Sequence, residues 1–166
     1  MTRSASTAAF AALLALVAGC GGGGGSSESA GGPVPQQLLG TYTTTLEQSD
    51  VEAAGSPPEI AGPDRSWTLR ILNKGGPDNG PVLAIDNKTA GNLEAPSLRV
   101  DGDRLLLRKE ECAAGGQYKF YDNEYAWKLS GKTLTITPVT NHCSDRVALT
   151  ILTSRPWTKT SATAGG

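Results

Sequence analysis

The stretch EYAWKLSGKTLTI, residues 124–136, contains the pattern that decides the fold. Apolar residues alternate with polar or small ones on both sides of Gly131, with Tyr125 and Trp127 before the turn and Ile136 after it. Such alternation is typical of strands with one buried face, and glycine supplies the positive φ that a tight hairpin requires. The stretch therefore predicts two antiparallel strands joined by a short turn.

The same alternation continues outward from this hairpin in both directions. Asp101-Gly102 has the turn chemistry of a second tight hairpin, and clusters of Gly, Pro, Asn and Asp separate the other apolar runs. We expect eight strands, over Thr41 to Glu47, Ser66 to Asn73, Pro81 to Asp86, Ser97 to Val100, Arg104 to Lys109, Glu124 to Leu129, Thr133 to Val139 and Arg146 to Thr153.

Each expected strand has one apolar face, and consecutive strands must bury these faces against one another. For a folded part of about 120 residues, the sequence predicts an all-β fold, a single eight-stranded antiparallel up-and-down β-barrel. A two-sheet sandwich is the structural alternative. The tight hairpins between neighbouring strands favour the barrel.

The residues from Gln48 to Asp64 interrupt this pattern. Ser49 or Asp50 is a candidate N-cap for a short helix over Val51 to Ala54, which Gly55 would end. An insertion of this length predicts either a lid over one end of the barrel or a loop that closes that end for stability.

The N-terminus has the parts of an export signal. Arg3 precedes an apolar run from Ala8 to Ala18, which is shorter than the roughly 20 residues that a spanning helix needs. Val17-Ala18-Gly19-Cys20 then resembles the lipobox of bacterial lipoproteins. The resemblance implies that residues 1–19 are removed and that Cys20 is acylated. The alternative is an ordinary secretory signal.

Domain organisation follows from these boundaries. Residues 20–35 are rich in Gly, Ser and Pro and read as a disordered tether, residues 36–159 as the barrel domain, and residues 160–166 as a flexible tail. Two or more acyl chains anchor a protein stably. We therefore expect the protein in the bacterial cell envelope, anchored to a membrane by lipid, with its domain outside the cytoplasm.

Two cysteines remain after Cys20. Cys112 and Cys143 would form a disulfide in an exported protein, which would stabilise the fold by about 3 to 4 kcal/mol in the chain-entropy model. The competing interpretation is a metal site that adds His142, but the spacing lacks the CxxC pattern of such sites.

Composition limits the other functions. The 15 basic and 16 acidic residues give a formal net charge of −1, and no basic patch predicts nucleic-acid binding. His142 is the single histidine, and it lies in an expected turn without a catalytic constellation. We expect a monomer that is not an enzyme and that uses no cofactor and no metal.

Several stretches resemble the lipocalin-like, calycin-type β-barrel proteins of bacterial envelopes. These are Gly40-Thr41-Tyr42, Gly116-Gln117-Tyr118, Tyr125 through Ile136, and Cys143-Ser144-Asp145-Arg146 through Pro156-Trp157, within a similarity that spans residues 38–157. In lipocalins a Gly-x-Trp closes one barrel end beneath an arginine. The resemblance implies that Gly40 and Tyr42, with Tyr in place of Trp, do so here beneath Arg146 or Arg155. A tyrosine ring can accept a guanidinium in this way; alternatively, Tyr42 is a core aromatic and Arg146 a solvated charge.

Two functions remain. In the first, the barrel interior binds a small hydrophobic molecule, with the 48–64 insertion as its gate. In the second, the barrel has a solid core and acts through its surface as an envelope interaction or inhibitor module. The candidate ligand-binding residues are Trp67, Leu69, Leu107, Tyr125, Trp127 and Ile136.

Overall fold

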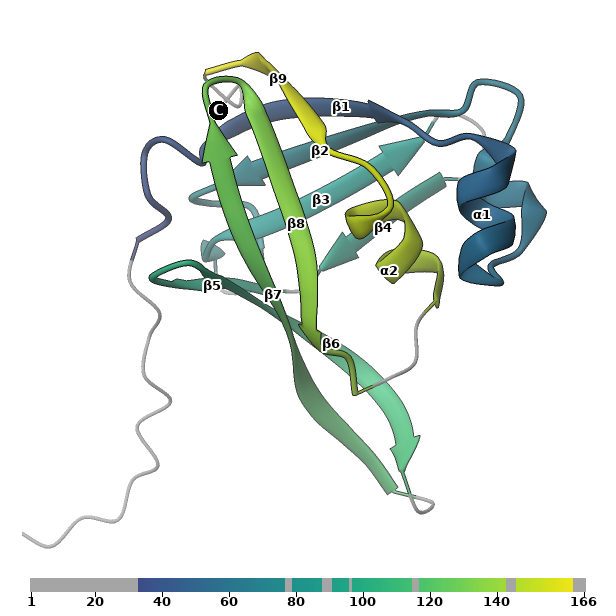
Figure 1. Ribbon diagram of the computed structural model, residues 1–166. Coiled ribbons are helices and arrows are strands. Elements are labelled where there is room, and N and C mark those ends of the chain that lie inside the picture. The colour runs from purple at the N-terminus through teal and green to yellow at the C-terminus, as the bar shows by residue number, and fades with distance from the viewer. Residues whose placement is uncertain are drawn as a thin grey trace, which may run out of the picture.

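The computed structural model describes residues 33–76, 79–87, 91–95, 97–114, 117–142 and 146–162. Antiparallel strands make up most of this part of the chain (Figure 1), so the predicted fold class is confirmed. The helical segments are α1 (Gln48–Ala54), the 3-10 segment η1 (Pro58–Ala61) and α2 (Arg146–Thr153). The strands are β1 (Gly40–Thr45), β2 (Ser66–Leu72), β3 (Val82–Asn87), β4 (Gly91–Ala95), β5 (Ser97–Asp101), β6 (Arg104–Ala114), β7 (Gln117–Ser130), β8 (Thr133–Thr140) and β9 (Trp157–Ser161).

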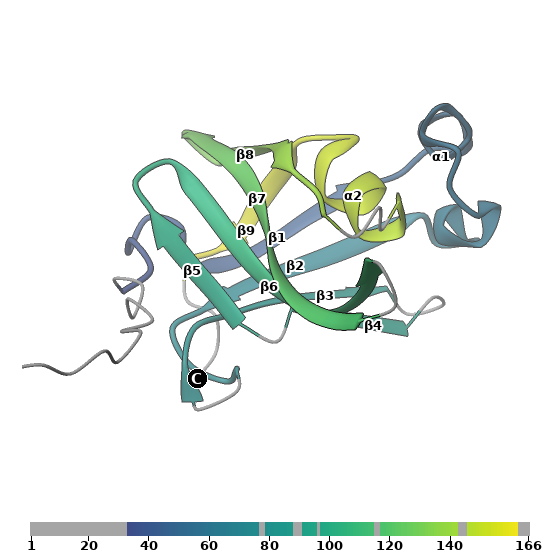
Figure 2. The ribbon, with the colours of Figure 1, turned by 90° about the horizontal axis from the view of Figure 1, so that it is seen from below.

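The sheet curves until its two edge strands, which are consecutive in the chain, lie next to each other. Its order is β4-β3-β2-β1-β9-β8-β7-β6-β5, so β4 and β5 form its two edges, and one residue separates them. The backbone N–H of Leu98 in β5 donates to the carbonyl oxygen of Pro81, just before β3, over 3.0 Å. If β4 and β5 are counted as one strand, the sheet has eight antiparallel strands, and they form a nearly closed barrel (Figure 2).

Both predicted tight hairpins are present. Ser130 pairs with Thr133 across the turn between β7 and β8, and Asp101 pairs with Arg104 between β5 and β6. Gly131 has a φ of 59° and Gly102 a φ of 56°, which is the left-handed region that glycine enters without steric cost.

The hairpin of β6 and β7 is longer than predicted. β5 pairs with β6 only as far as Arg108, and β8 pairs with β7 only from Glu124 onward. The rest of the hairpin extends past its neighbours as a two-stranded ribbon (Figure 1). The charged run Lys109-Glu110-Glu111 broke the apolar alternation, so the sequence did not indicate that the strand continues.

The predicted eighth strand, Arg146 to Thr153, is wrong, because these residues form α2. Val147 and Ile151 are four residues apart, so they share one face of a helix as well as one face of a strand. The helix buries Thr150, Ile151 and Leu152. The place of the eighth strand belongs to β9, which pairs with both β8 and β1.

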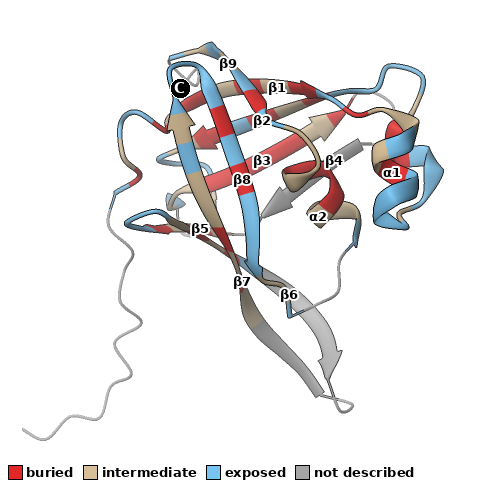
Figure 3. Cartoon of the chain, viewed as in Figure 1, coloured by how far each residue is buried: buried red, intermediate tan, exposed pale blue. Residues whose placement is uncertain are grey.

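The two ends of the barrel are covered differently (Figure 3). Val34 and Leu38, which precede β1, are buried at one end. The helical segments lie together at the opposite end (Figure 1), where Val51 and Ile60 join the hydrophobic core. Burying one such aliphatic side chain contributes about 1.5 to 3 kcal/mol to folding.

Candidate functional site

The inner face of the barrel is the candidate site, because every strand around it with described side chains turns an apolar face inward. Alternate residues along these strands are buried in one continuous cluster, as expected for a strand with one face on the core. Its strand members are Tyr42, Trp67, Leu69, Ile71, Leu83, Ile85, Leu98, Val100, Leu105, Leu107, Tyr125, Leu134, Ile136 and Trp157.

Five of the six predicted lining residues belong to the core of the barrel. Trp67, Leu69 and Ile136 are almost completely buried, with exposed fractions of 0%, 0% and 1%. Leu107 and Tyr125 also belong to the core but keep exposed fractions of 7% and 2%. The structure therefore brings these five together inside the barrel.

Trp127 lies at the margin of this set. It is partly buried against the core, and its indole N–H donates to the carbonyl oxygen of Gly102 over 3.2 Å. The bond joins β7 to the turn between β5 and β6.

Tyr125 is the inward-facing tyrosine on the wall formed by β5, β6 and β7. Burial raises the pKa of Tyr125 to about 12, so its hydroxyl is neutral at physiological pH. Among the described residues, none forms a hydrogen bond with this hydroxyl. Because no fully buried side-chain polar atom of the described residues lacks a partner, the hydroxyl reaches accessible space. Tyr42 differs, because its hydroxyl donates to the carbonyl oxygen of Leu38 over 2.8 Å.

Two tryptophans attach the helical segments to the barrel. Trp67 in β2 donates its indole N–H to the carbonyl oxygen of Ile60 in η1 over 3.1 Å. Trp157 in β9 donates to the carbonyl oxygen of Leu152 in α2 over 3.0 Å. Trp157 is buried, and it holds the helix that covers this end of the barrel.

The helix α1 confirms the short helix that was predicted within residues 48–64, and it begins three residues earlier than predicted. Gly55, with a φ of 61°, ends it as predicted, but the N-cap is Glu47 and not Ser49 or Asp50. Asp50 instead completes a capping box, in which its carboxylate accepts from the Glu47 backbone N–H over 2.8 Å. Both halves of a capping box satisfy backbone donors that a helix start leaves free.

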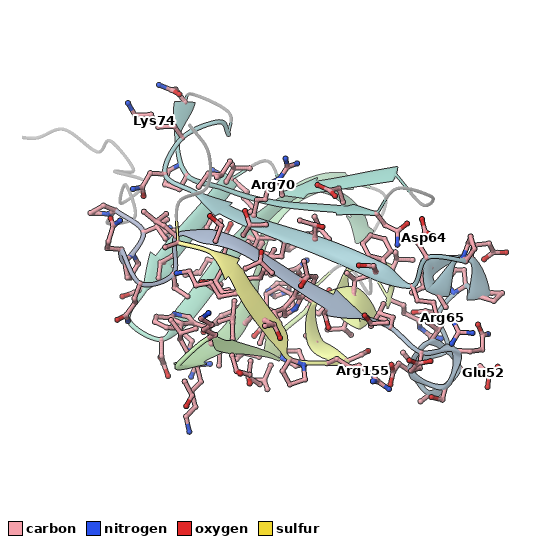
Figure 4. The ribbon with its side chains drawn as sticks, turned by 90° about the horizontal axis from the view of Figure 1, so that it is seen from above. Glu52, Asp64, Arg65, Arg70, Lys74 and Arg155 are labelled. Atoms are coloured by element: carbon pink, nitrogen blue, oxygen red, sulfur yellow. The ribbon has the colours of Figure 1, made fainter. Side chains whose placement is uncertain are left out.

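Polar contacts hold α1 against the end of the chain. Nε of Arg155 lies 2.5 Å from Oδ2 of Asp50, and Figure 4 shows Arg155 beside α1. Burial would raise the pKa of Asp50, but the hydrogen bonds from Arg155 and from the Glu47 backbone, with the charge of Arg155, lower it. Ser56 Oγ also lies 2.7 Å from Oγ1 of Thr150 in α2.

The opposite end is closed around Tyr42. Nζ of Lys159 lies 5.4 Å from the centre of the Tyr42 ring and donates to the carbonyl oxygen of Gln37 over 2.7 Å. A cation in this position is attracted by the ring face. Gly40 has a φ of 144°, and a Cβ there would lie 2.2 Å from the carbonyl oxygen of Ser161. Only glycine lets β1 and β9 approach so closely.

Arg146 does not take the position that the lipocalin resemblance implied. It begins α2, its side chain is exposed, and Nη1 lies 3.4 Å from the carbonyl oxygen of Gly55. Lys159 supplies the cation over Tyr42, and Arg155 is paired with Asp50. The sequence signal for Lys159 was weak, because a single lysine near the chain end is ordinarily a solvated charge.

The predicted cysteine chemistry lies outside the described residues. Cys20 and Cys143 are not described, and Cys112 is described only as part of β6. His142 is exposed, and its ring stacks on Tyr121 with ring centres 5.1 Å apart. Within the described ranges, His, Cys, Asp and Glu form no group of three that could hold a metal ion, and none of the helices is long and apolar enough to cross a membrane.

Comparisons with known proteins add little to this geometry. No family model matches the chain, and no curated protein does. A crystal structure of a mutant of the fluorescent protein UnaG is similar at 14% sequence identity and a TM-score of 0.36, over 65% of this chain and 91% of that one. A match at this level supports no statement about function.

Proposed function

We propose that the protein is a membrane-anchored barrel that binds a small hydrophobic molecule in its interior. An apolar interior with a few polar groups that orient the ligand is the usual form of a small-molecule site. The lipid anchor on Cys20 belongs to the proposal. So does the absence of enzymatic activity.

The observation that carries this proposal is the contrast between two buried tyrosines. Tyr42 uses its hydroxyl within the protein, whereas no described residue bonds the hydroxyl of Tyr125. Because the Tyr125 hydroxyl is accessible and can both donate and accept a hydrogen bond, it is available to a ligand. A ligand with a polar atom at one end would supply the missing partner, and its apolar body would lie against Leu107 and the neighbouring wall.

The exposed fractions indicate where such a molecule would lie. Tyr42, Trp67 and Leu69 on the β1–β2 wall have an exposed fraction of 0%. Val100 and Leu107 on the β5–β6 wall each keep 7%. We therefore infer that the ligand lies next to Val100 and Leu107.

The cover over the barrel end supports a route for the ligand. Val51 is the single buried residue of α1. Polar contacts join this helix and the two residues after it to later parts of the chain, namely Asp50 to Arg155, Gly55 to Arg146 and Ser56 to Thr150. Segments with few buried apolar contacts open at low free-energy cost. We infer that α1 is the element that moves when the ligand enters.

The anchor would hold the barrel close to a source of apolar ligands. The predicted tether, residues 20–35, has 16 residues, and a Gly-rich coil of that length would span on the order of 20 to 25 Å. This distance lets the barrel reorient while it remains next to the membrane.

Mass spectrometry of organic extracts from the purified protein tests the proposal. We expect an apolar molecule in stoichiometric amount from the unmodified chain. Leu107→Trp should reduce that amount by filling the interior, whereas Leu106→Trp, on the outer face of the same strand, should not. Melting curves establish that both variants fold. Extracts without any bound molecule, and no binding of added fatty acids, would exclude the proposal.

The ribbon of β6 and β7 favours a second candidate, a surface interaction module. Past Arg108 no described strand pairs with the outer edge of β6, and before Glu124 no described strand pairs with the outer edge of β7. Unpaired strand edges can accept a strand from another protein. Hydrogen exchange of residues 109–123 with and without envelope extract tests this candidate, and unchanged exchange there would oppose it.

A further inference from the structure

The outer surface of the barrel differs in composition from one side to the other. The outward positions of β5, β6 and β7 include Arg99, Arg104, Arg108, Asp122, Glu124 and Lys128. Three other adjacent strands are uncharged there, and their outward residues are Thr133, Thr135 and Thr137 of β8, Thr158 and Thr160 of β9, and Thr41, Thr43 and Thr45 of β1. The β propensity of threonine explains its presence on strands, but not its concentration on one side.

The register aligns three of these threonines with Thr68 of β2, and the four form one row across the strands. Thr133 lies opposite Thr158, Thr158 opposite Thr43, and Thr43 opposite Thr68 of β2. Neighbours in such a row are about 4.8 Å apart. Each hydroxyl can both donate and accept a hydrogen bond, so the row is a regular array of uncharged polar groups.

Three of the four residues in this row, Thr158, Thr43 and Thr68, line two hollows in the surface. One hollow of about 370 Å³ is lined by Thr43, Thr44, Thr45, Ser66, Arg155, Pro156 and Thr158. A second hollow of about 290 Å³ is lined by Ser66, Thr68, Asp86 and Asn87, with Asp64. The two hollows are neighbours, because Ser66 lines both, and together they are called the groove here. They lie over β9, β1, β2 and β3, on the face seen in Figure 4.

The charges around this groove are largely neutralised. Arg155 is paired with Asp50 at 2.5 Å, and Asp86 with Arg70 at 2.9 Å. A polyanion such as a nucleic acid needs unpaired cations, which this groove does not offer among its described residues. The threonine and serine hydroxyls that line it match a ligand that is itself uncharged and rich in hydroxyl groups.

We propose that this groove binds a neutral glycan chain. Sugar hydroxyls, like threonine hydroxyls, donate and accept, and the threonine methyl groups provide small apolar contacts for the faces of the sugar rings. The groove lies on the outer surface of the barrel wall, so the inference is independent of the ligand proposed for the interior. The barrel would then contact a glycan with one outer wall.

Co-sedimentation of the full chain with insoluble chitin, cellulose and starch tests this site. Thr43→Lys combined with Thr158→Lys places two charges in the groove and should raise the apparent Kd for the bound glycan about tenfold or more, as expected when polar contacts are lost. Thr135→Lys combined with Thr137→Lys is the matched control, because it adds the same two charges on the outer face of β8, outside both hollows. It should leave the Kd unchanged.

Each other outcome would overturn the proposal. These outcomes are an absence of binding to all three glycans, equal binding by the groove variant and the control, and binding to heparin in place of the neutral glycans. Equal melting temperatures for the three proteins would show that lost binding is not lost folding. If the variant with lysine at positions 43 and 158 does not fold, Thr43→Ala and Thr158→Ala are measured in its place. They should weaken glycan binding without adding charge.

Discussion

Nε of Arg155 lies 2.5 Å from Oδ2 of Asp50, which joins the loop before the last strand to the first helix across 105 residues of sequence. The carboxylate is the less exposed partner, with 18% of its side chain exposed against 41% for the arginine. This pair fastens α1, the helix that we propose opens for the ligand.

Replacing Arg155 should loosen α1. In Arg155→Gln the backbone amides of residues 51–55 should exchange up to about fivefold faster, the range expected for a partly exposed ion pair. Arg70→Gln breaks a pair of similar exposure on the outer face of β2 and β3, and it should leave these amides unchanged. Equal exchange in both variants would show that Arg155 does not hold the helix.

The same pair predicts a dependence of stability on pH. Because the folded state lowers the pKa of Asp50 from 3.8, the carboxylate stabilises the fold fully above pH 3.8 and loses this effect as the pH falls through the lowered pKa. Denaturation of the unmodified protein and of Asp50→Asn should therefore differ at about pH 6 and converge in acid. A constant difference across this range would contradict the assignment.

Trp67 should contribute more to stability than Trp127. Trp67→Phe removes volume from the core and leaves the Ile60 carbonyl oxygen without its donor, at an expected cost of about 2 to 4 kcal/mol. Trp127→Phe, in a partly exposed position, should cost about 1 kcal/mol or less. Urea denaturation measures both losses in the free energy of unfolding. Similar losses would mean that burial of Trp67 and its bond to η1 do not add to stability.

Gly40 should tolerate no side chain. The Cβ of Gly40→Ala would lie 2.2 Å from the Ser161 carbonyl oxygen at a φ of 144°, so we expect a loss of about 2 to 4 kcal/mol. Gly131→Ala has a φ of 59° and no atom within 4 Å. It should cost only the left-handed strain of about 1 to 2 kcal/mol. Thermal unfolding of the two variants distinguishes a contact effect from backbone strain.

The two buried tyrosines should respond differently to loss of the hydroxyl. Tyr42→Phe breaks the bond to Leu38 and should lower stability by about 1 kcal/mol, with no change in ligand affinity. Tyr125→Phe should keep stability within about 0.5 kcal/mol but weaken binding of a ligand with a polar end, such as a fatty acid. The opposite pattern, measured by titration and melting, would remove Tyr125 from the site.

Much of the barrel could be predicted because its information is local. The alternation around Tyr125 and Ile136 and the glycines at 102 and 131 specify strands and turns through contacts within a few residues. Gly55 likewise ended a short helix where the sequence indicated. Five of the six proposed lining residues are in the core for the same reason, since alternation alone decides which side chains share a face.

The functional contacts were harder to predict because they join distant parts of the chain. Lys159 over Tyr42, Arg155 with Asp50, and the Trp67 bond to Ile60 each depend on which residues the closed sheet brings together. The row from Thr133 to Thr68 depends on the register of four strands. A shift of one residue in any of them would turn that strand's threonines inward.

The sequence by itself therefore determined seven of the strands, the tight turns and the inward apolar face, because side-chain alternation and glycine conformation act over a few neighbouring residues. Only the tertiary structure decided that Arg146–Thr153 is a helix. Its apolar spacing fits both a helix and a strand. Because β9 already pairs with both β8 and β1, the segment satisfies its own backbone hydrogen bonds as a helix at the barrel end.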